Sequence, residues 1–167
     1  MANNVITTAL LIIAGITAAM ILMSAVFPAI YHMTGTFNSV ASDMNDKMLT
    51  DVGILFTQPE RKVIHVWLKN TGRNEIPSGL LESSDISIVS FSKDVENRYL
   101  RVPYKRSGVT KPYWRYTFED ANGDYWGTGE NIEVEVSLRR PLETGVYTIR
   151  FMTYNGFIAE DVFSVER

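Results

Sequence analysis

The stretch "VITTALLIIAGITAAMILMSAVF", from Val5 to Phe27, contains no charged side chain and lies near the start of the chain. A helix rises about 1.5 Å per residue, so this stretch would span about 34 Å. The hydrocarbon core of a bilayer is about 30 Å thick. The sequence therefore predicts an apolar N-terminal helix that is long enough to cross a membrane.

The charges of the chain are distributed unevenly. The formal net charge is −3 over 167 residues, and every Asp, Glu, Lys and Arg lies at or beyond Asp43. So small a net charge provides no electrostatic footprint for nucleic acid, and we expect no nucleic-acid partner. Cysteine is absent, which excludes disulfides, thiolate metal sites and cysteine nucleophiles. We expect one apolar N-terminal segment joined to one soluble domain.

The apolar stretch does not match a cleaved leader. A secretory signal has a basic segment before a shorter apolar run, whereas residues 1–4 carry no basic side chain. The basic-glycine cleavage site of a prepilin signal also has no counterpart here. We therefore expect the helix to remain in the mature chain as a membrane anchor.

The helical pattern continues beyond the bilayer-spanning stretch. Apolar residues recur at steps of three and four to about residue 49, which keeps one face of a helix apolar; they are Phe37, Val40, Ala41, Met44 and Met48. We expect a membrane-anchoring and assembly helix over residues 1–49, about 70 Å long. The expected assembly interface comprises Phe37, Val40, Met44, Met48 and the small residues Ala14, Gly15, Ala18 and Ala19.

These small residues have two interpretations. Ala14 and Ala18, and likewise Gly15 and Ala19, are four residues apart, the spacing that allows close helix packing in lipid or in a bundle. Alanine is also common in membrane spans for no such reason. The sequence leaves both interpretations open.

Residues 50–167 change to a period of two. Short apolar-alternating runs are separated by turn residues, and in the run from Asn131 to Leu138 the residues Ile132, Val134 and Val136 face one way. We expect an all-β immunoglobulin-like sandwich, so the fold class of the whole chain is α+β. A break is expected at residues 58–60, and Asn155-Gly156 predicts a two-residue type I′ hairpin turn.

No catalytic motif is found in the sequence. The two histidines, His32 and His65, lack metal-ligand spacing, and Gly127-Thr128-Gly129 lacks the third glycine of a dinucleotide fingerprint. We expect no catalytic residue, no enzymatic activity and no organic cofactor.

One loop is a candidate calcium site. Asp120, Asn122 and Asp124 alternate as in the first half of a calcium loop, and Glu130 follows them. Tyr125 stands where an EF-hand requires glycine, so the alternative is an ordinary turn of Asx and Gly residues.

Aromatic residues gather in the same region. Trp114, Tyr116 and Phe118 alternate and are expected to form the core face of one strand. Tyr125 and Trp126 are expected on a loop, where an exposed pair would suit a partner surface.

Three stretches carry a resemblance to a known family: Ser24–Val40, Leu49–Phe56 and Val66–Pro77. Together with the order of parts, they resemble the archaeal flagellin superfamily of pilin-like proteins, and within it the FlaG family of accessory archaellum proteins. In that family the helix passes through a Thr-Asp pair into the first strand, and a Lys-Asn-Thr-Gly turn ends the second. Here these residues are Thr50-Asp51 and Lys69-Asn70-Thr71-Gly72.

The resemblance implies a non-enzymatic, static component of the archaellum motor in the archaeal cell envelope. It implies a stator that self-assembles through its helix, with the β domain outside the cytoplasmic membrane and with a FlaF-like partner and the S-layer nearby.

The alternative is an archaellin or pilin-like subunit of an extracellular filament. The missing signal-peptidase site and the absence of Asn-x-Ser/Thr sequons count against it. A membrane-anchored binding domain or enzyme unrelated to motility is a third hypothesis.

Overall fold

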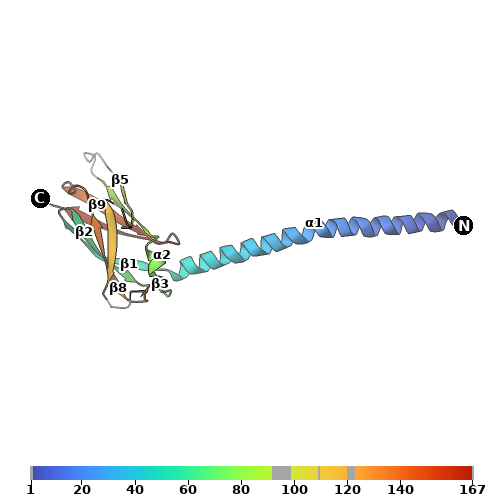
Figure 1. Ribbon diagram of the computed structural model, residues 1–167, viewed down its shortest axis with the longest axis horizontal. Helices are drawn as coiled ribbons and strands as arrows, with labels where there is room; N and C mark the ends of the chain where they lie inside the picture. Colours follow the sequence, from blue (N-terminus) through green and yellow to red (C-terminus); the bar gives the residue numbers. More distant parts are fainter. Residues whose placement is uncertain (1, 92–98, 109, 120–122, 167) are drawn as a thin grey trace. The chain divides into compact units, whose positions relative to one another are not determined.

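The structure is a computed structural model, and it describes the chain except for residues 1, 92–98, 109, 120–122 and 167 (Figure 1). The chain forms two compact units, residues 1–44 and residues 45–167. The second unit therefore contains the last turn of the N-terminal helix together with the β domain.

The N-terminal helix, α1, runs without interruption from Ala2 to Leu49 and includes Pro28 (Figure 1). Its 48 residues correspond to a length of about 72 Å. Threonine hydroxyls in the apolar part donate to the carbonyl one turn earlier, as Thr8 does to Asn4 at 2.8 Å and Thr17 to Ile13 at 2.8 Å. These hydroxyls are satisfied within the helix, as an apolar solvent requires.

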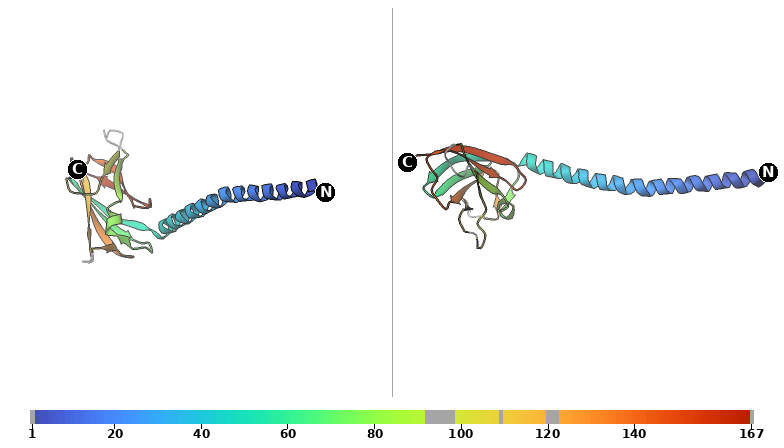
Figure 2. Two further views of the ribbon diagram at one scale, coloured as in Figure 1. Left: turned by 45° about the vertical axis from the view of Figure 1, so that its right-hand side comes forward. Right: turned by 90° about the horizontal axis from the view of Figure 1, so that it is seen from above.

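The β domain is a sandwich of two antiparallel four-stranded sheets, as the sequence predicts. Figure 2 shows the sheets as two layers facing each other. The first sheet has the order β1-β2-β8-β6, formed by Val52–Glu60, Val63–Asn70, Asn131–Ser137 and Tyr113–Phe118. The second sheet has the order β10-β9-β4-β5, formed by Ile158–Val165, Gly145–Met152, Asp85–Ser90 and Tyr99–Val102.

Two short strands and one helical turn complete the domain. The strand β3 (Ile76–Pro77) pairs with β7 (Tyr125–Trp126), and α2 (Ser78–Leu81) follows β3 directly. The sequence reasoning did not expect these pieces, because two-residue strands have no period to detect.

The core lies between the two sheets. Alternating residues of β8 point into it, with Ile132, Val134 and Val136 fully buried. Trp114 of β6 is also buried and meets Phe151 of β9 edge-on, with ring centroids 6.0 Å apart. The predicted core face of β6 is confirmed, since Tyr116 and Phe118 pack against the same core.

The predicted break at residues 58–60 is wrong. Strand β1 continues through Pro59, which lies opposite Ile64, and ends at Glu60. The strand lies at the edge of its sheet, where a residue without an N–H is tolerated. The chain reverses instead at residues 61–62, where Arg61 has a φ of 44°.

The predicted type I′ turn at Asn155-Gly156 is also wrong, although a hairpin is present. Met152 pairs with Ile158, so the loop spans residues 153–157. Gly156 has a φ of 79°, but Asn155 is not among the residues with positive φ, and a type I′ turn requires both. The longer loop is held by Thr153, whose Oγ1 donates to the Asn155 side-chain oxygen at 2.7 Å.

Candidate assembly site

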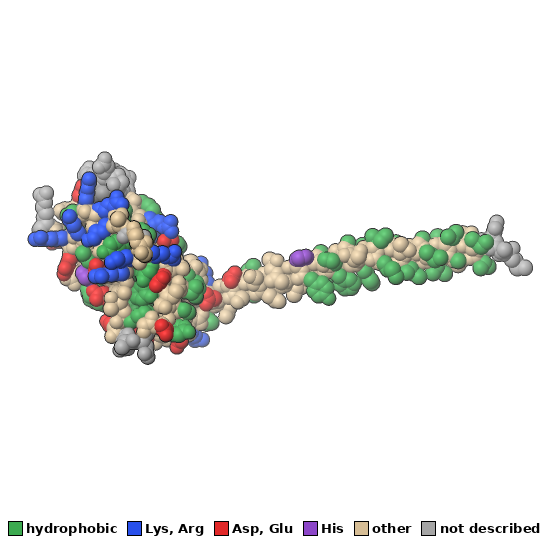
Figure 3. Space-filling model, in the orientation of Figure 1, with side chains coloured by type: hydrophobic (Ala, Val, Ile, Leu, Met, Phe, Trp, Pro, Cys, Tyr) green, Lys and Arg blue, Asp and Glu red, His purple; other side chains and the backbone are tan. Residues whose placement is uncertain are grey.

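The surface of α1 is apolar and has no cover within the chain. Every side chain from Asn4 to Asn45 is exposed, and Figure 3 shows hydrophobic side chains along the helix. Of the predicted interface residues, Phe37 is 71% exposed, Met44 60% and Met48 82%. Val40 is exposed as well. Contiguous apolar surface of this kind marks a site that lipid or another protein covers.

The four small residues of the predicted interface lie in the same exposed stretch. Residues four apart share a face of a helix, so Ala14 lies above Ala18 and Gly15 above Ala19. A Cβ atom added at Gly15 would meet no atom within 4 Å. The packing of this chain alone therefore does not require glycine there, and a close helix contact at this position stays a prediction.

The length and composition of α1 also meet the requirement for crossing a membrane. The candidate span lies within Asn4–Leu49, near the N-terminus, and its most apolar segment of 18 residues is fully unburied. Since a bilayer core needs only about 20 residues, the helix has more apolar length than one span uses.

The last turn of α1 is held by a network of side-chain hydrogen bonds centred on Asp46. The carboxylate of Asp46 accepts hydrogen bonds from the Asn74 side-chain amide at 2.8 Å, the Tyr154 hydroxyl at 2.8 Å and the Asn155 side-chain amide at 3.1 Å. The Asn155 amide also donates to the Thr50 hydroxyl at 2.8 Å. We call Asp46, Thr50, Asn74, Tyr154 and Asn155 the junction network.

The junction network changes the acidity of Tyr154. Partial burial raises the pKa of Tyr154 to about 12. The neighbouring Asp46 carboxylate, which accepts a hydrogen bond from the Tyr154 hydroxyl, adds to the increase. A tyrosine that stays protonated can keep donating a hydrogen bond to Asp46 over the whole physiological pH range.

The two motifs that carry the family resemblance meet at the end of the helix. The Leu49 carbonyl accepts the backbone N–H of Arg73 at 2.8 Å, and the Asp51 carbonyl accepts those of Thr71 at 3.0 Å and Gly72 at 2.9 Å. The Lys-Asn-Thr-Gly turn thus binds the Asp51 carbonyl just beyond the helix, and Arg73, directly after the turn, binds the Leu49 carbonyl that the helix end leaves without a partner. Its role here is structural.

Gly72 and Asn70 explain why this turn has its sequence. A Cβ atom at Gly72 would lie 2.6 Å from both the Asp51 nitrogen and the Leu49 oxygen, which leaves room only for glycine. The buried Asn70 side chain donates to the carbonyls of Asn74 at 2.9 Å and Trp126 at 3.0 Å. Asn70 therefore joins the turn to β7.

Sequence reasoning missed Asp46 as a functional residue, because it treated this position only as lying off the apolar face. The available signal was its position four residues before Thr50, at the end of the predicted helix. Its partners Tyr154 and Asn155 are more than 100 residues away in the sequence, so no local pattern connects them.

The predicted exposed pair Tyr125 and Trp126 is wrong for Trp126. These residues form β7 rather than a loop, and Trp126 is 0% exposed with its indole N–H donating to the Glu130 carbonyl at 3.0 Å. Successive residues of a strand point to opposite sides, so Tyr125 is left exposed alone. Tyr125 remains a candidate for a partner contact.

The calcium candidates are only partly described. Asp120 and Asn122 lie outside the described residues. The Glu130 carboxylate accepts the Gly127 N–H at 2.7 Å, and the Asp124 carbonyl accepts the Ser78 N–H at 2.9 Å. Within the described part of the chain, no group of three or more His, Cys, Asp or Glu side chains could hold a metal ion. Calcium binding by this loop stays a prediction.

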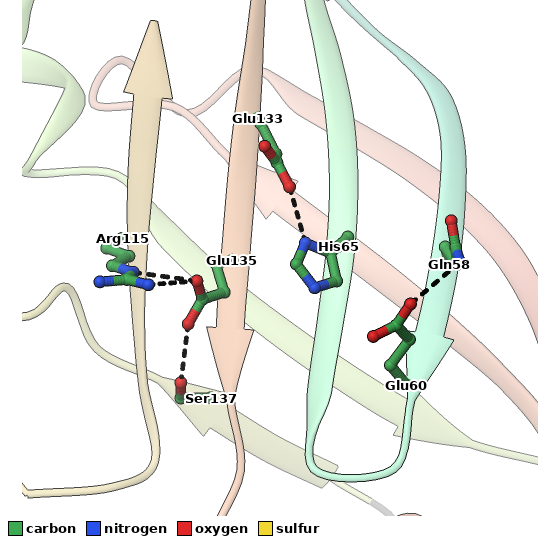
Figure 4. Close-up of polar contacts among 7 residues, drawn as sticks. All are labelled: Gln58, Glu60, His65, Arg115, Glu133, Glu135 and Ser137. Carbon is green, nitrogen blue, oxygen red and sulfur yellow. Dashed lines mark hydrogen bonds and ion pairs between the residues drawn. The ribbon is translucent and has the colours of Figure 1, made fainter.

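The outer face of the β1-β2-β8-β6 sheet carries pairwise polar contacts (Figure 4). The His65 Nδ1 lies 2.6 Å from Glu133, and the Arg115 guanidinium donates to Glu135 with its Nε at 3.0 Å. These contacts link neighbouring strands on a partly exposed surface, where an ion pair contributes about 0–1 kcal/mol. They resemble ordinary cross-strand pairs rather than a catalytic arrangement.

Sequence comparison identifies a relative of full length. No family model matches the chain. An uncharacterised protein of Archaeoglobus fulgidus is 33% identical over 171 residues, which cover 98% of this chain and 99% of that protein. The chain belongs to the same family as this archaeal protein. The shared length includes both the helix and the sandwich.

Structural comparison relates the fold to archaellum proteins. The archaellum periplasmic stator protein FlaG from Sulfolobus acidocaldarius matches with a TM-score of 0.55 and 21% identity, over 69% of this chain and all of that one. A chain of the FlaF–FlaG stator complex from the same organism matches with a TM-score of 0.53 and 24% identity, over 69% of this chain and 90% of that one. The chain has a FlaG-like fold.

We expect Gly72→Ala to destabilise the protein by about 1–3 kcal/mol, because the new methyl group would overlap the backbone at the helix end. Gly79→Ala is the matched control, since a Cβ atom there meets no atom within 4 Å. Urea denaturation followed by tryptophan fluorescence measures both. Equal stability of the two variants would contradict this account of the turn.

The Tyr154 proton makes stability depend on alkaline pH. The folded-state pKa, about 12, is above the ordinary value of 10.0, so this contribution is fully present below pH 10 and is lost as the pH rises through 12. Tyr154→Phe should make the free energy of unfolding fall less steeply over this range than in the wild type. Tyr104→Phe tests the other tyrosine with a pKa raised to about 12, which lies beside Glu82 rather than Asp46.

Tyr154→Phe should also lower the stability of the protein at neutral pH. Tyr154→Phe removes a donor from the Asp46 carboxylate, at a cost of about 1.5–3 kcal/mol for a hydrogen bond to a charged group. Pairing Tyr154→Phe with Asp46→Asn in a double-mutant cycle measures their coupling. Additive losses would show that the hydroxyl and the carboxylate do not interact.

Proposed function

We propose that this protein is a non-enzymatic, membrane-anchored stator component of an archaellum motor that self-assembles through α1. The observation that carries the proposal is a FlaG-like sandwich in the same chain as a 48-residue helix whose apolar side chains are uncovered. The FlaG of Sulfolobus acidocaldarius is described as a periplasmic stator protein, which supports placing the sandwich of this chain outside the cytoplasmic membrane.

The excess length of the helix supports self-assembly. A bilayer covers about 20 residues of a helix, so lipid leaves part of the exposed stripe uncovered. A large apolar side chain gains about 1.5–3 kcal/mol when it is buried. Phe37, Val40, Met44 and Met48 continue the stripe beyond the apolar run that ends at Phe27. Sister helices are the cover that we propose for them.

A stator has a mechanical reason for such contacts. A static element must resist the torque of a motor, and many lateral contacts between subunits distribute that load. The small residues Ala14, Gly15, Ala18 and Ala19 would allow the helices to approach closely. We further propose a FlaF-like partner for the sandwich, because the FlaG-like chain of similar fold is found in a FlaF–FlaG complex. The S-layer is the expected neighbour on the outer side.

The alternative function is a subunit of an extracellular archaellin-like or pilin-like filament. It uses the same apolar helix. Shearing of cells, followed by electron microscopy of the sheared material, distinguishes a filament subunit from a stator component. A stator component stays with the membrane fraction when cells are sheared, whereas a filament subunit leaves with the sheared filaments.

Replacing Gly15 with Leu should disrupt assembly of the full-length protein without unfolding the sandwich. The side chain has space within one chain but would push neighbouring helices apart. Leucine also favours a helix over glycine by about 0.8 kcal/mol, so loss of assembly could not reflect a weaker helix. Light scattering and electron microscopy in mild detergent measure particle size. Gly15→Ala, which keeps the residue small, should assemble as the wild type does. Particles of wild-type size in Gly15→Leu would contradict close helix packing at this position.

Truncation should separate assembly from folding. Residues 45–167 keep Asp46 and are expected to form a soluble, folded monomer, because all of the apolar stripe except Met48 is removed while the junction network remains. Residues 50–167 lose Asp46 and are expected to be less stable by about 2 kcal/mol. Light scattering and urea denaturation measure these properties. If residues 45–167 assemble as extensively as the full chain, the helix is only an anchor.

A further inference from the structure

The small net charge of the chain conceals two oppositely charged ends of the sandwich. Three loops meet at the end away from the junction network: residues 61–62, residues 103–108 with 110–112, and residues 138–144. We call them the distal pole. The Leu138 N–H donates to the Lys62 carbonyl at 2.8 Å, and the Arg139 Nε donates to the Lys111 carbonyl. The described residues of these loops include one acid, Glu143, and the cations Arg61, Lys62, Lys105, Arg106, Lys111, Arg139 and Arg140.

The opposite end of the sandwich has the reverse balance. Around the junction network and β7 lie more acids than bases; the acids are Asp46, Asp51, Glu75, Asp124 and Glu130, and the bases are Lys47, Lys69 and Arg73. Most of the Lys and Arg side chains visible on the sandwich in Figure 3 lie in its upper half as drawn. The distal pole is therefore a region of locally positive potential on an acidic protein.

The cations of the distal pole are not neutralised by their described neighbours. The ion pairs between described residues use Arg101, Arg115, Arg150 and His65, none of which belongs to these loops. Lys105 lies over the Tyr113 ring, 4.9 Å from its centroid. Arg140 is exposed.

A cavity of about 460 Å³ opens between the 138–144 loop and strands β4, β5 and β9. Buried side chains of Ile88, Leu138 and Tyr147 line it, together with Leu100 and Leu142, and Arg139, Arg140 and Glu143 also contribute to its wall. The Tyr147 hydroxyl donates to the Glu143 carbonyl at 2.9 Å and so ties the 138–144 loop to β9. The volume lies in the range of ligand sites and exceeds that of one large side chain.

We propose that the distal pole binds an acidic protein segment that inserts one apolar side chain into this cavity. The arginines would pair with carboxylates on either side of the inserted residue, since a guanidinium presents its donors in a fork that matches a carboxylate. The apolar lining of the cavity distinguishes this site from a simple patch of cations. Such a patch could bind an anionic membrane surface without any cavity.

The proposal is independent of the helix and of any motor role. It is tested on full-length protein in nanodiscs of neutral phosphatidylcholine. The probe is a fluorescein-labelled peptide with one central phenylalanine flanked by glutamates, and fluorescence anisotropy reports its binding. Matched peptides replace the phenylalanine with serine, or the glutamates with lysines. Both should bind at least about tenfold more weakly, and added salt should weaken the binding of the first peptide.

Two charge-reversal variants locate the site. Arg140→Glu should weaken binding about tenfold or more, whereas Arg73→Glu, with the same change in net charge at the opposite end, should change it less than about twofold. Circular dichroism checks that both remain folded. Equal binding of the serine peptide, or equal loss in both variants, would overturn the proposal and leave a non-specific cation patch. Displacement of the peptide by short-chain phosphatidylglycerol at lower concentration than by unlabelled peptide would overturn it in favour of a lipid site.

Discussion

The carboxylate of Asp46 links the last turn of the helix to the loops of the sandwich by hydrogen bonds. Three donors from two separate loops converge on it, at 2.8 to 3.1 Å. A partly buried carboxylate needs such donors, because burial without them would cost several kcal/mol. Asp46 therefore joins the last helical turn to both the 71–74 turn and the 153–157 loop.

The helix and the sandwich differ in how their polar and apolar groups are satisfied. In the helix, backbone groups and threonine hydroxyls are satisfied internally, while the apolar side chains have no cover from the chain itself. In the sandwich, the apolar side chains cover each other, and polar side chains pair across strands on the outer face of the β1-β2-β8-β6 sheet. A helix built this way is expected to be covered by lipid or by other chains, and this expectation is the physical basis for the proposed anchoring and assembly role.

The sandwich is also asymmetric from end to end. Its acidic end includes the Asp46 network, and its basic end includes the open cavity beside Leu138 and Tyr147. At the acidic end, the backbone of Leu49 and Asp51 packs so closely against Gly72 that no side chain fits there. The end that carries the helix junction and the end that carries the cavity therefore differ in both charge and shape.

The sequence by itself determined the elements whose signal is local. The uncharged run from Val5 to Phe27 and the alternation of Ile132, Val134 and Val136 predicted the helix and a half-buried strand, because periodicity depends only on neighbouring residues. Tertiary structure alone decided the rest. Tyr154 meets Asp46 across 108 residues of sequence, and Trp126 is buried because β7 pairs with β3, a strand too short to have a period. Pro59 could remain in a strand only because β1 lies at a sheet edge. The cavity of the distal pole likewise needs loops that are distant in sequence, and contacts of this kind are set by how the sheets pack rather than by any local pattern.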